Sequence, residues 1–454
     1  MNTRIIGIAA LLASLSAGAL AAQTVAAGGK EPNTGAIGSP GLGALVAHAL
    51  EMNPAIRAAA DRVEAARARI APAGVIPDPW VGVGVTNLPL DGAGFNDMMA
   101  MKMVGVAQTI PFPGKLGLQR RIAERQFASA EATLAATRLE VGREVKEAYY
   151  EAAFLDRALE VLERSHEVLV NFIQVTESRY SVGVGGQQDV LKARVEAARL
   201  GEEAVALAEQ RRSALAQLNA ALNRPSETPV ESPEIPSQIA LAAVAESPAG
   251  IRFVSSALGA RAAGSPLPPL AELHETAVRE NRELRAHEAM IDAQEAVVAL
   301  ARKEHLPDFD LSLQYGQRNQ RPDMVSAMVS MEIPIQKGRK QDLLVKETEA
   351  ELSALRAEHK AKANAVRARV VDLYTEMERD RAQLALYVKS IIPQGRAALT
   401  SATTSFQVGK ADFLMVLENQ ATLYDYETAY FRGLTDFARK LAELEQVVGK
   451  DILR

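Results

Sequence analysis

The sequence predicts a mainly α-helical protein with a small β part, built from two copies of one structural plan. Three observations support this prediction. The 454-residue chain repeats a series of short motifs at a spacing of roughly half its length. Each half contains one very long stretch in which apolar residues recur at alternating spacings of four and three. Each half also contains two short segments in which apolar and polar residues alternate, the pattern of half-buried strands.

Composition and charge exclude several classes of protein. Hydrophobic residues make up 48% of the chain and charged residues 24%, which is typical of a folded protein. The net charge is -5 and Lys and Arg are interleaved with Glu and Asp, so nothing indicates a nucleic-acid partner. The absence of Cys rules out disulfides and an acylated N-terminal cysteine. We find no GxSxG, P-loop or HExxH motif and no Cys nucleophile, so we predict no enzymatic activity and no cofactor.

The first residues are typical of a secretory signal peptide, which we place at residues 1–21. Arg4 precedes an apolar run over residues 5–20, and Ala-Leu-Ala at 19–21 fits the small-x-small cleavage pattern. The alternative, an uncleaved anchor helix, is less favoured because a bilayer span needs about 20 residues.

The internal repeat divides the rest of the chain. Residues 22–224 form the first repeat and residues 269–454 the second, and a Pro- and Ser-rich linker over 225–268 separates them because Pro cannot continue a helix. The linker contains Pro225, Pro229, Pro233, Pro236 and Pro248. The matched motifs lie at 52–54 and 280–282, 77–78 and 307–308, 110–112 and 333–335, and 180–183 and 406–409.

Each repeat has the same predicted order of elements: a helix, a β-hairpin, a very long helix and a further helix. In the first repeat these cover 41–74, about 77–112, 114–180 and 187–223. In the second repeat they cover 269–305, about 308–335, 337–405 and 412–448.

The long segments predict coiled-coil packing. From Val141 to Ile173, and again from Val366 to Ile391, core positions are spaced alternately four and three residues apart. Heptads alone do not distinguish a coiled coil from an ordinary helical bundle. Length does, because a helix of about 66 residues is roughly 100 Å long, wider than one globular core. We expect the two shorter helices of each repeat to stack end to end beside the long one. His166 falls on a heptad position and is expected to be packed rather than a ligand.

The four short segments are predicted to be transmembrane β-strands. They are 309–315 and 325–333 in the second repeat, and the less regular 80–86 and 102–110 in the first. A tilted strand crosses a bilayer with about 9–11 residues. A soluble hairpin alternates in the same way, but the signal peptide, the long helices and the duplication favour a membrane. An open sheet edge is not tolerated in lipid, so the barrel must be shared between chains. Three copies would give a closed 12-strand barrel and twelve helical columns.

The sequence resembles a known family, the TolC-like outer-membrane factors. The resemblance rests on Tyr-x-x-Gly...Asp-Val-Leu at 180–191, on its counterpart at 406–417, and on the double plan itself. The segment Gln-Thr-Ile-Pro-Phe-Pro-Gly-Lys at 108–115 is similar to the heavy-metal (CzcC-type) branch.

The resemblance implies a homotrimer in the outer membrane, with a 12-strand barrel and a 12-helix periplasmic tunnel around which the linker forms an equatorial region. It also implies a periplasmic adapter (membrane fusion) protein and an inner-membrane RND-type transporter as partners. The chain would be a passive exit duct, for heavy-metal cations in that branch. A type I secretion or drug-efflux duct would have the same fold. A soluble periplasmic coiled-coil adapter is disfavoured, because two full repeats each contain strands.

The two helix turns are predicted adapter-docking tips. Gly183 and Gly409 sit where a left-handed residue would end each long helix. The residues that the family pattern assigns to docking are Tyr180, Gly183, Asp189, Val190, Leu191, Phe406, Gly409, Val416 and Leu417.

The resemblance also implies a periplasmic gate, but only part of the family's gate pattern is present in this sequence. Drug-exporting relatives have a Val-Asp-Val-Leu-Asp pattern, whereas residues 414–418 read Leu-Met-Val-Leu-Glu. Met415 replaces the first acid and Glu418 retains the second, while Asp412 and the basic Lys410 lie close by. Rings of acids select cations in pores. The alternative interpretation of these acids is that they lie at a solvated helix start, where a negative charge interacts favourably with the helix dipole.

Four methionines, Met98, Met99, Met101 and Met103, are weak metal candidates, because thioethers suit Cu(I). The alternative is a loop and strand that face lipid or the barrel wall. The six scattered His residues show no paired spacing for a tight metal site.

Overall fold

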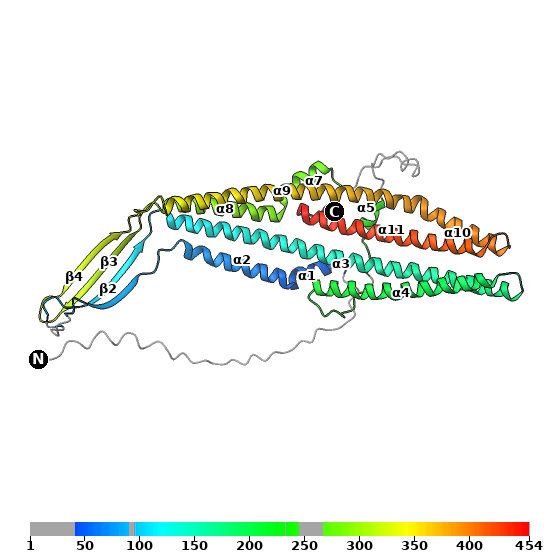
Figure 1. Ribbon diagram of the computed structural model, residues 1–454, viewed down its shortest axis with the longest axis horizontal. Coiled ribbons are helices and arrows are strands. Elements are labelled where there is room, and N and C mark those ends of the chain that lie inside the picture. The colour runs from blue at the N-terminus through cyan, green and yellow to red at the C-terminus, as the bar shows by residue number, and fades with distance from the viewer. Residues whose placement is uncertain (1–40, 90–94, 96, 232, 245–266, 454) are drawn as a thin grey trace. The chain divides into compact units, whose positions relative to one another are not determined.

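The computed structural model describes residues 41–89, 95, 97–231, 233–244 and 267–453. The predicted signal peptide and Pro248 of the linker lie outside the described residues. In the described part, long helices predominate and four strands form one small sheet, which confirms the predicted fold class (Figure 1).

The two repeats contain corresponding elements. The first comprises α1 (Leu42–Met52), α2 (Pro54–Ala73), β1 (Trp80–Thr86), β2 (Met101–Ile110), α3 (Lys115–Ser181) and α4 (Gln187–Ala221). Between the repeats lies α5 (Ser237–Val244). The second comprises α7 (Leu270–Glu280), α8 (Arg282–Lys303), β3 (Phe309–Arg318), β4 (Met324–Met331), α9 (Gln341–Leu386), η2 (Tyr387–Ile391), α10 (Ile392–Gln407) and α11 (Phe413–Val448). None of the described helices has an apolar stretch long enough to cross a membrane.

An asparagine divides the opening helix of each repeat, where a single helix was expected. Oδ1 of Asn53 accepts a 2.8 Å hydrogen bond from the backbone N–H of Ala55 and so caps α2. Oδ1 of Asn281 caps α8 in the same way by accepting from Leu284 at 3.0 Å. The capping side chains start new helices at the repeated motif 52–54 and 280–282.

The same two asparagines join the short helices end to end, as expected. Nδ2 of Asn53 donates to the carbonyl of Ala221, the last residue of α4, at 3.0 Å. Nδ2 of Asn281 donates to the carbonyl of Val447 in the last turn of α11, at 2.9 Å. Each side chain therefore satisfies a carbonyl at a helix end that has no partner within its own helix.

The two long helices differ. Helix α3 is unbroken, but its counterpart passes from α9 through the π-helical turn η2 into α10. Pro393 follows this turn and lacks the backbone N–H that a regular α-helix would use. The wider turn accommodates this loss.

The heptad seam of α3 departs from the expected positions at His166, although Leu162 and Leu169 are buried as expected. His166 is exposed and Ser165 is buried in its place. The prediction for His166 was therefore wrong. In this region α3 packs against both α4 and α11, and the side of α3 that faces them includes Ser165 rather than His166. Nε2 of Gln420 donates to the Ser165 hydroxyl at 3.1 Å.

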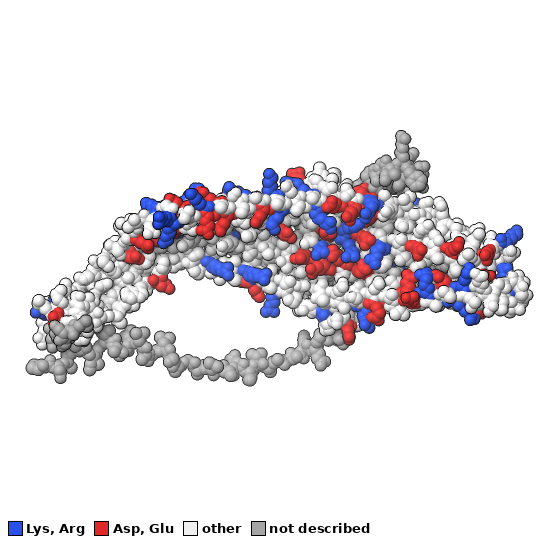
Figure 2. Space-filling view, viewed as in Figure 1, with Lys and Arg blue, Asp and Glu red and all other residues white. Residues whose placement is uncertain are grey.

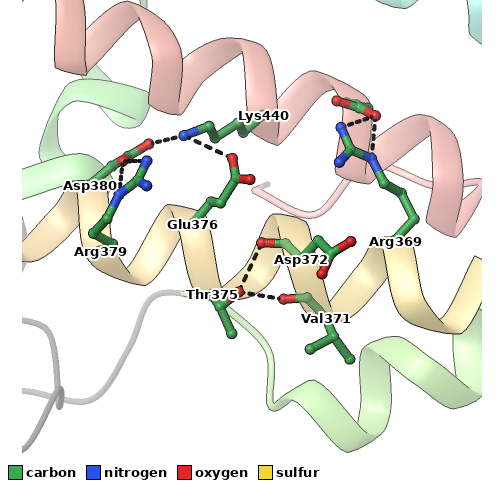
Figure 3. A network of polar contacts seen from close by, with 9 residues as sticks. Arg369, Val371, Asp372, Thr375, Glu376, Arg379, Asp380 and Lys440 are labelled. Carbon is green, nitrogen blue, oxygen red and sulfur yellow. Dashed lines mark hydrogen bonds and ion pairs between the residues drawn. The ribbon is translucent and has the colours of Figure 1, made fainter.

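The seam of α9 includes a charge, Asp380, which a network of ion pairs accommodates (Figure 3). Its carboxylate lies 2.6 Å from Nζ of Lys440 on α11 and 2.9 Å from Nη2 of Arg379. Lys440 also lies 3.1 Å from Glu376. About three turns before Asp380 on α9, Arg369 pairs with Glu443 at 2.6 Å. The network ties α9 to α11 through paired charges rather than apolar contact alone.

The four strands form one antiparallel sheet in the order β1-β2-β3-β4. The pairing of β2 with β3 joins the repeats, from Met101 opposite Arg318 to Ile110 opposite Phe309. Among the described residues, β1 and β4 each pair on one side only. The sheet therefore has two free edges.

The two faces of the sheet differ in chemistry. One face presents apolar side chains from all four strands, since Val83 lies opposite Val104, Val104 opposite Tyr315, and Tyr315 opposite Val325. These side chains are exposed in the single chain, Val83 at 81% and Val325 at 69%. The other face carries small, polar and methionine side chains, among them Gly84, Met103, Ser312 and Ser326. On the side drawn in Figure 2, charged residues are spread over the helices and are few over the sheet.

A buried lysine fixes the junction between sheet and helices. Nζ of Lys115, at the start of α3, lies 3.1 Å from Glu304 and 3.0 Å from Asp308. Asp308 also accepts a 2.7 Å hydrogen bond from the backbone N–H of Phe112. Burial alone would lower the pKa of Lys115, but its hydrogen bonds to Asp308 and Glu304 outweigh this and raise the pKa. The ammonium therefore stays charged and holds the two repeats together at the sheet.

Candidate functional site

The turns that end the two long helices have the same backbone geometry. Gly183 and Gly409 adopt left-handed conformations, with φ of 77° and 74°. The N–H of Val184 donates to the carbonyl of Arg179 at 2.9 Å, and the N–H of Lys410 donates to that of Ser405 at 2.8 Å. This is the hydrogen bonding of a Schellman motif, for which Gly is favoured because it lacks a Cβ. Both glycines lie where the sequence placed them.

Arg179 joins the two turns, which sequence reasoning missed. Its Nη1 donates to the carbonyl of Phe406 at 2.5 Å, and its guanidinium lies 4.7 Å from the centre of the Phe406 ring. The carbonyl of Phe406 lies in the last turn of α10, where helix carbonyls attract cations. The corresponding position in the second repeat is Ser405, so the second repeat has no matching arginine that could contact the first turn.

Apolar side chains pack beneath the turns and hold the two helical pairs together. Phe172 and Ala193 of the first repeat form one cluster with four side chains of the second. The rings of Phe406 and Phe413 lie 5.8 Å apart, centre to centre. The members contributed by the second repeat are Ala402, Phe406, Phe413 and Val416.

The predicted docking residues therefore fall into two groups. Val190, Phe406 and Val416 are buried and support the turns from inside. Asp189 and Leu417 are half-buried. The exposed members are Tyr180, Gly183, Leu191 and Gly409. Their use by a partner remains a prediction.

Exposed valines surround the two glycines and were not singled out from the sequence. Val182, Val184 and Val408 are 72%, 68% and 64% exposed. With Tyr180, Leu191 and Met415, they give the end of the helices an apolar exterior, which we call the turn surface. The only signal in the sequence is a β-branched apolar residue beside each tip glycine, where solvated turns usually carry polar residues.

The predicted gate residues are all exposed on the second-repeat turn. Lys410 follows Gly409, Asp412 precedes α11, and Glu418 lies in its second turn. The Asp412 side chain makes no capping hydrogen bond. None of the three side chains has a hydrogen bond or ion pair with another residue that the structure describes. Their charges are therefore available to solvent, a cation or a neighbouring chain.

The four methionines do not converge on one point in the structure. Met98 and Met99 are exposed in the loop before β2. Met101 and Met103 lie on the polar face of β2, where Sδ of Met103 accepts a 2.8 Å hydrogen bond from the Thr86 hydroxyl. Among the described residues, no group of three or more His, Cys, Asp or Glu side chains is placed to hold a metal ion.

The chain is similar to known proteins in both sequence and fold. The chain is 24% identical over 410 residues to the cobalt-zinc-cadmium resistance protein CzcC of Cupriavidus metallidurans, spanning 87% of this chain and 86% of CzcC. Its fold is similar to that of the outer membrane protein VceC from Vibrio cholerae, with a TM-score of 0.73 at 18% identity, covering 90% of this chain and 96% of VceC. It is also similar to CusC, with a TM-score of 0.72 at 15% identity, covering 90% and 92%.

The family model described as "Outer membrane efflux protein" matches residues 45–224 and 273–450, which is most of the chain and falls on the two repeats. These two blocks agree with the duplicated order of helices and strands. The chain therefore belongs to the outer membrane efflux protein family and is an efflux channel of the Gram-negative outer membrane.

Proposed function

We propose that three copies of the chain form a passive exit duct in a tripartite efflux pump, and that the cargo is heavy-metal cations. The observation that carries this proposal is the four-stranded sheet with two free edges and one exposed apolar face. The exposed apolar face is unfavourable in water, and the free edges are unfavourable in lipid. Both are resolved when the sheets of several copies join edge to edge within a membrane.

The size of the sheet supports three copies. Free backbone groups at a sheet edge cost several kcal/mol each in lipid, so β1 of one copy would pair with β4 of the next. Four strands from each of three copies give twelve, within the range of outer-membrane barrels, which starts at about 8. The apolar face would contact lipid, and the polar face with Ser312 and Ser326 would line the lumen.

The cargo is proposed from similarity. The relative CzcC is a cobalt-zinc-cadmium resistance protein. The segment at 108–115 resembles the same branch, and it ends in Lys115, whose buried ion pairs fix the junction of sheet and helices. In this proposal the duct performs no reaction, and free energy comes from an inner-membrane RND-type transporter.

The turn surface is the proposed docking site for a periplasmic adapter. It is apolar, exposed and held rigid by the cluster beneath it, which is the character of a protein interface. Asp412 and Glu418 of three copies would form acidic rings next to this surface, and Lys410 would moderate their charge.

A resistance assay tests the proposal. The chain is expressed in a Gram-negative host that has the matching adapter and transporter genes but lacks its own duct gene. We expect restored growth in Zn²⁺, Co²⁺ or Cd²⁺ and a lower metal content per cell, measured by mass spectrometry. The control is Leu313→Lys, which places a charge on the apolar face. Protection against organic drugs without protection against metals would contradict the cargo, and export of a polypeptide would favour the secretion alternative.

A further inference from the structure

Two histidines face each other between α8 and α9, away from the turns and the sheet. The helices run antiparallel, since Arg302 pairs with Glu349 while His287 lies opposite Glu358. The rings of His287 and His359 have centroids 5.9 Å apart and planes inclined by 32°. No motif in the sequence indicates this pair, because the two residues lie far apart along the chain.

Each ring has a carboxylate of the opposite helix on one side. Nε2 of His287 lies 3.6 Å from Glu358, which precedes His359. Nε2 of His359 lies 3.8 Å from Glu288, which follows His287. The arrangement is reciprocal: each helix contributes one imidazole and one carboxylate. A carboxylate on the Nε2 side favours the tautomer with its proton on Nε2, which leaves Nδ1 with a free lone pair.

Both Nδ1 atoms are buried and have no hydrogen-bond partner. His287 is 7% exposed, so water does not compensate for the missing partner. Buried polar atoms are almost always paired in folded proteins, and an unpaired one calls for an explanation. A ligand that accepts two nitrogen lone pairs would provide it.

We propose that His287 and His359 bind one divalent transition-metal cation, such as Zn²⁺ or Cu²⁺, through their Nδ1 atoms. Neutral imidazole is a preferred ligand for both ions. With metal–nitrogen bonds of about 2.0–2.1 Å, two imidazoles on one ion have centroids on the order of 5–6 Å apart, which the observed spacing fits. Metal-bound histidines commonly direct their second nitrogen to a carboxylate, and Glu358 and Glu288 lie 3.6 and 3.8 Å from these nitrogens here.

The site supplies two protein ligands, so water or another small ligand completes the coordination. The ion therefore exchanges with solvent, to which His359 is connected because 25% of its side chain is exposed. Bound metal would join α8 to α9 near the start of α8. This inference does not depend on the cargo, since binding is measured on the isolated protein.

The test is a titration of the purified, untagged full-length protein with ZnCl₂ at pH 7.5, followed by calorimetry. We expect about one ion per chain for the native protein and binding at least 10-fold weaker for His287→Gln and for His359→Gln. The matched control is His166→Gln, which removes an exposed imidazole on α3 and should leave the affinity unchanged. Glu358→Gln, at a mostly exposed side chain, should weaken binding without removing a ligand.

A second measurement separates metal binding from loss of structure. In the Cu²⁺-loaded native protein, electron paramagnetic resonance should show coupling to two imidazole nitrogens, and in His359→Gln to one. Detergent-corrected native mass verifies that the variants assemble as the native protein does. Equal zinc affinity in the native protein and both histidine variants would overturn the proposal, as would a copper spectrum without nitrogen coupling.

Discussion

Arg179 shows how one side chain can couple the two repeats at their turns. It donates to the carbonyl of Phe406 and lies over the Phe406 ring. Phe406 lies in α10, three residues before Gly409. A hydrogen bond that involves a charged group contributes about 1.5–3 kcal/mol. The stability of the second turn therefore depends on a residue of the first.

Replacing Arg179 should loosen the second turn. In Arg179→Leu we expect faster backbone hydrogen exchange over residues 406–411, because the carbonyl at the end of α10 loses its cationic partner. The control is Arg194→Leu, which breaks an exposed ion pair with Glu177 and should change exchange little. Unchanged exchange at Lys410 in Arg179→Leu would show that the link is not used.

The gate residues lead to a prediction about ion selectivity. If Asp412 and Glu418 line the end of the duct, Asp412→Asn with Glu418→Gln should reduce the preference for cations, because rings of acids attract them. The reversal potential of single channels in a planar bilayer under a salt gradient measures this. Glu202→Gln, at an exposed acid on α4, is the control. An unchanged reversal potential in the double variant would place these acids outside the pore.

At the scale of elements, the asparagine junctions explain the repeated motif at 52–54 and 280–282. Asn281 both caps α8 and holds the end of α11, so one residue serves two helices.

We predict that Asn281→Ala destabilises the folded chain by more than the loss of a cap alone, which costs about 0.5–2 kcal/mol. The added cost comes from the unpaired carbonyl of Val447. Thermal unfolding followed by circular dichroism measures the difference from Asn364→Ala, an exposed Asn within α9. Equal midpoints for the two variants would contradict a structural role of the junction.

The sheet allows a comparison of neighbouring residues on opposite faces. Leu313→Lys places a charge on the apolar face and should reduce insertion, at a cost of about 2–4 kcal/mol near the middle of a bilayer. Ser312→Lys places the same charge on the polar face, and we expect normal insertion. The readout is the amount of folded protein in purified outer membranes. The opposite order of the two variants would mean that the faces are assigned the wrong way round.

Local sequence patterns were sufficient to predict the strands and turns. Contacts between residues far apart in the sequence could not be predicted from such patterns. Alternation predicted the strands, and Gly183 and Gly409 predicted the turns, because each signal lies within a few adjacent residues. The partner of Arg179 lies in the other repeat, and the second role of Asn281 depends on how helix ends meet. The error at His166 arose because α3 packs against both α4 and α11 there, so that Ser165 rather than His166 faces Gln420 of α11. The burial of some predicted tip residues likewise depends on packing between the repeats, which the sequence does not show.

For the whole molecule, we expect that a single chain is incomplete as a channel. In the proposed duct, neighbours would cover the free edges of β1 and β4, the exposed apolar face and the exposed turn surface. The charged network of α9 and α11, by contrast, is satisfied within the chain (Figure 3). The parts that neighbours would cover are therefore the sheet and the helix ends, which are the parts assigned to membrane and partner.

The native mass of the mature protein, extracted from outer membranes in detergent and corrected for bound detergent, shows directly whether the barrel is shared between chains. We expect the mass of three chains, held together after dilution because the β1 edge of one chain is paired with the β4 edge of the next. The mass of one chain, with no requirement for detergent, would contradict the shared barrel and with it the proposed duct.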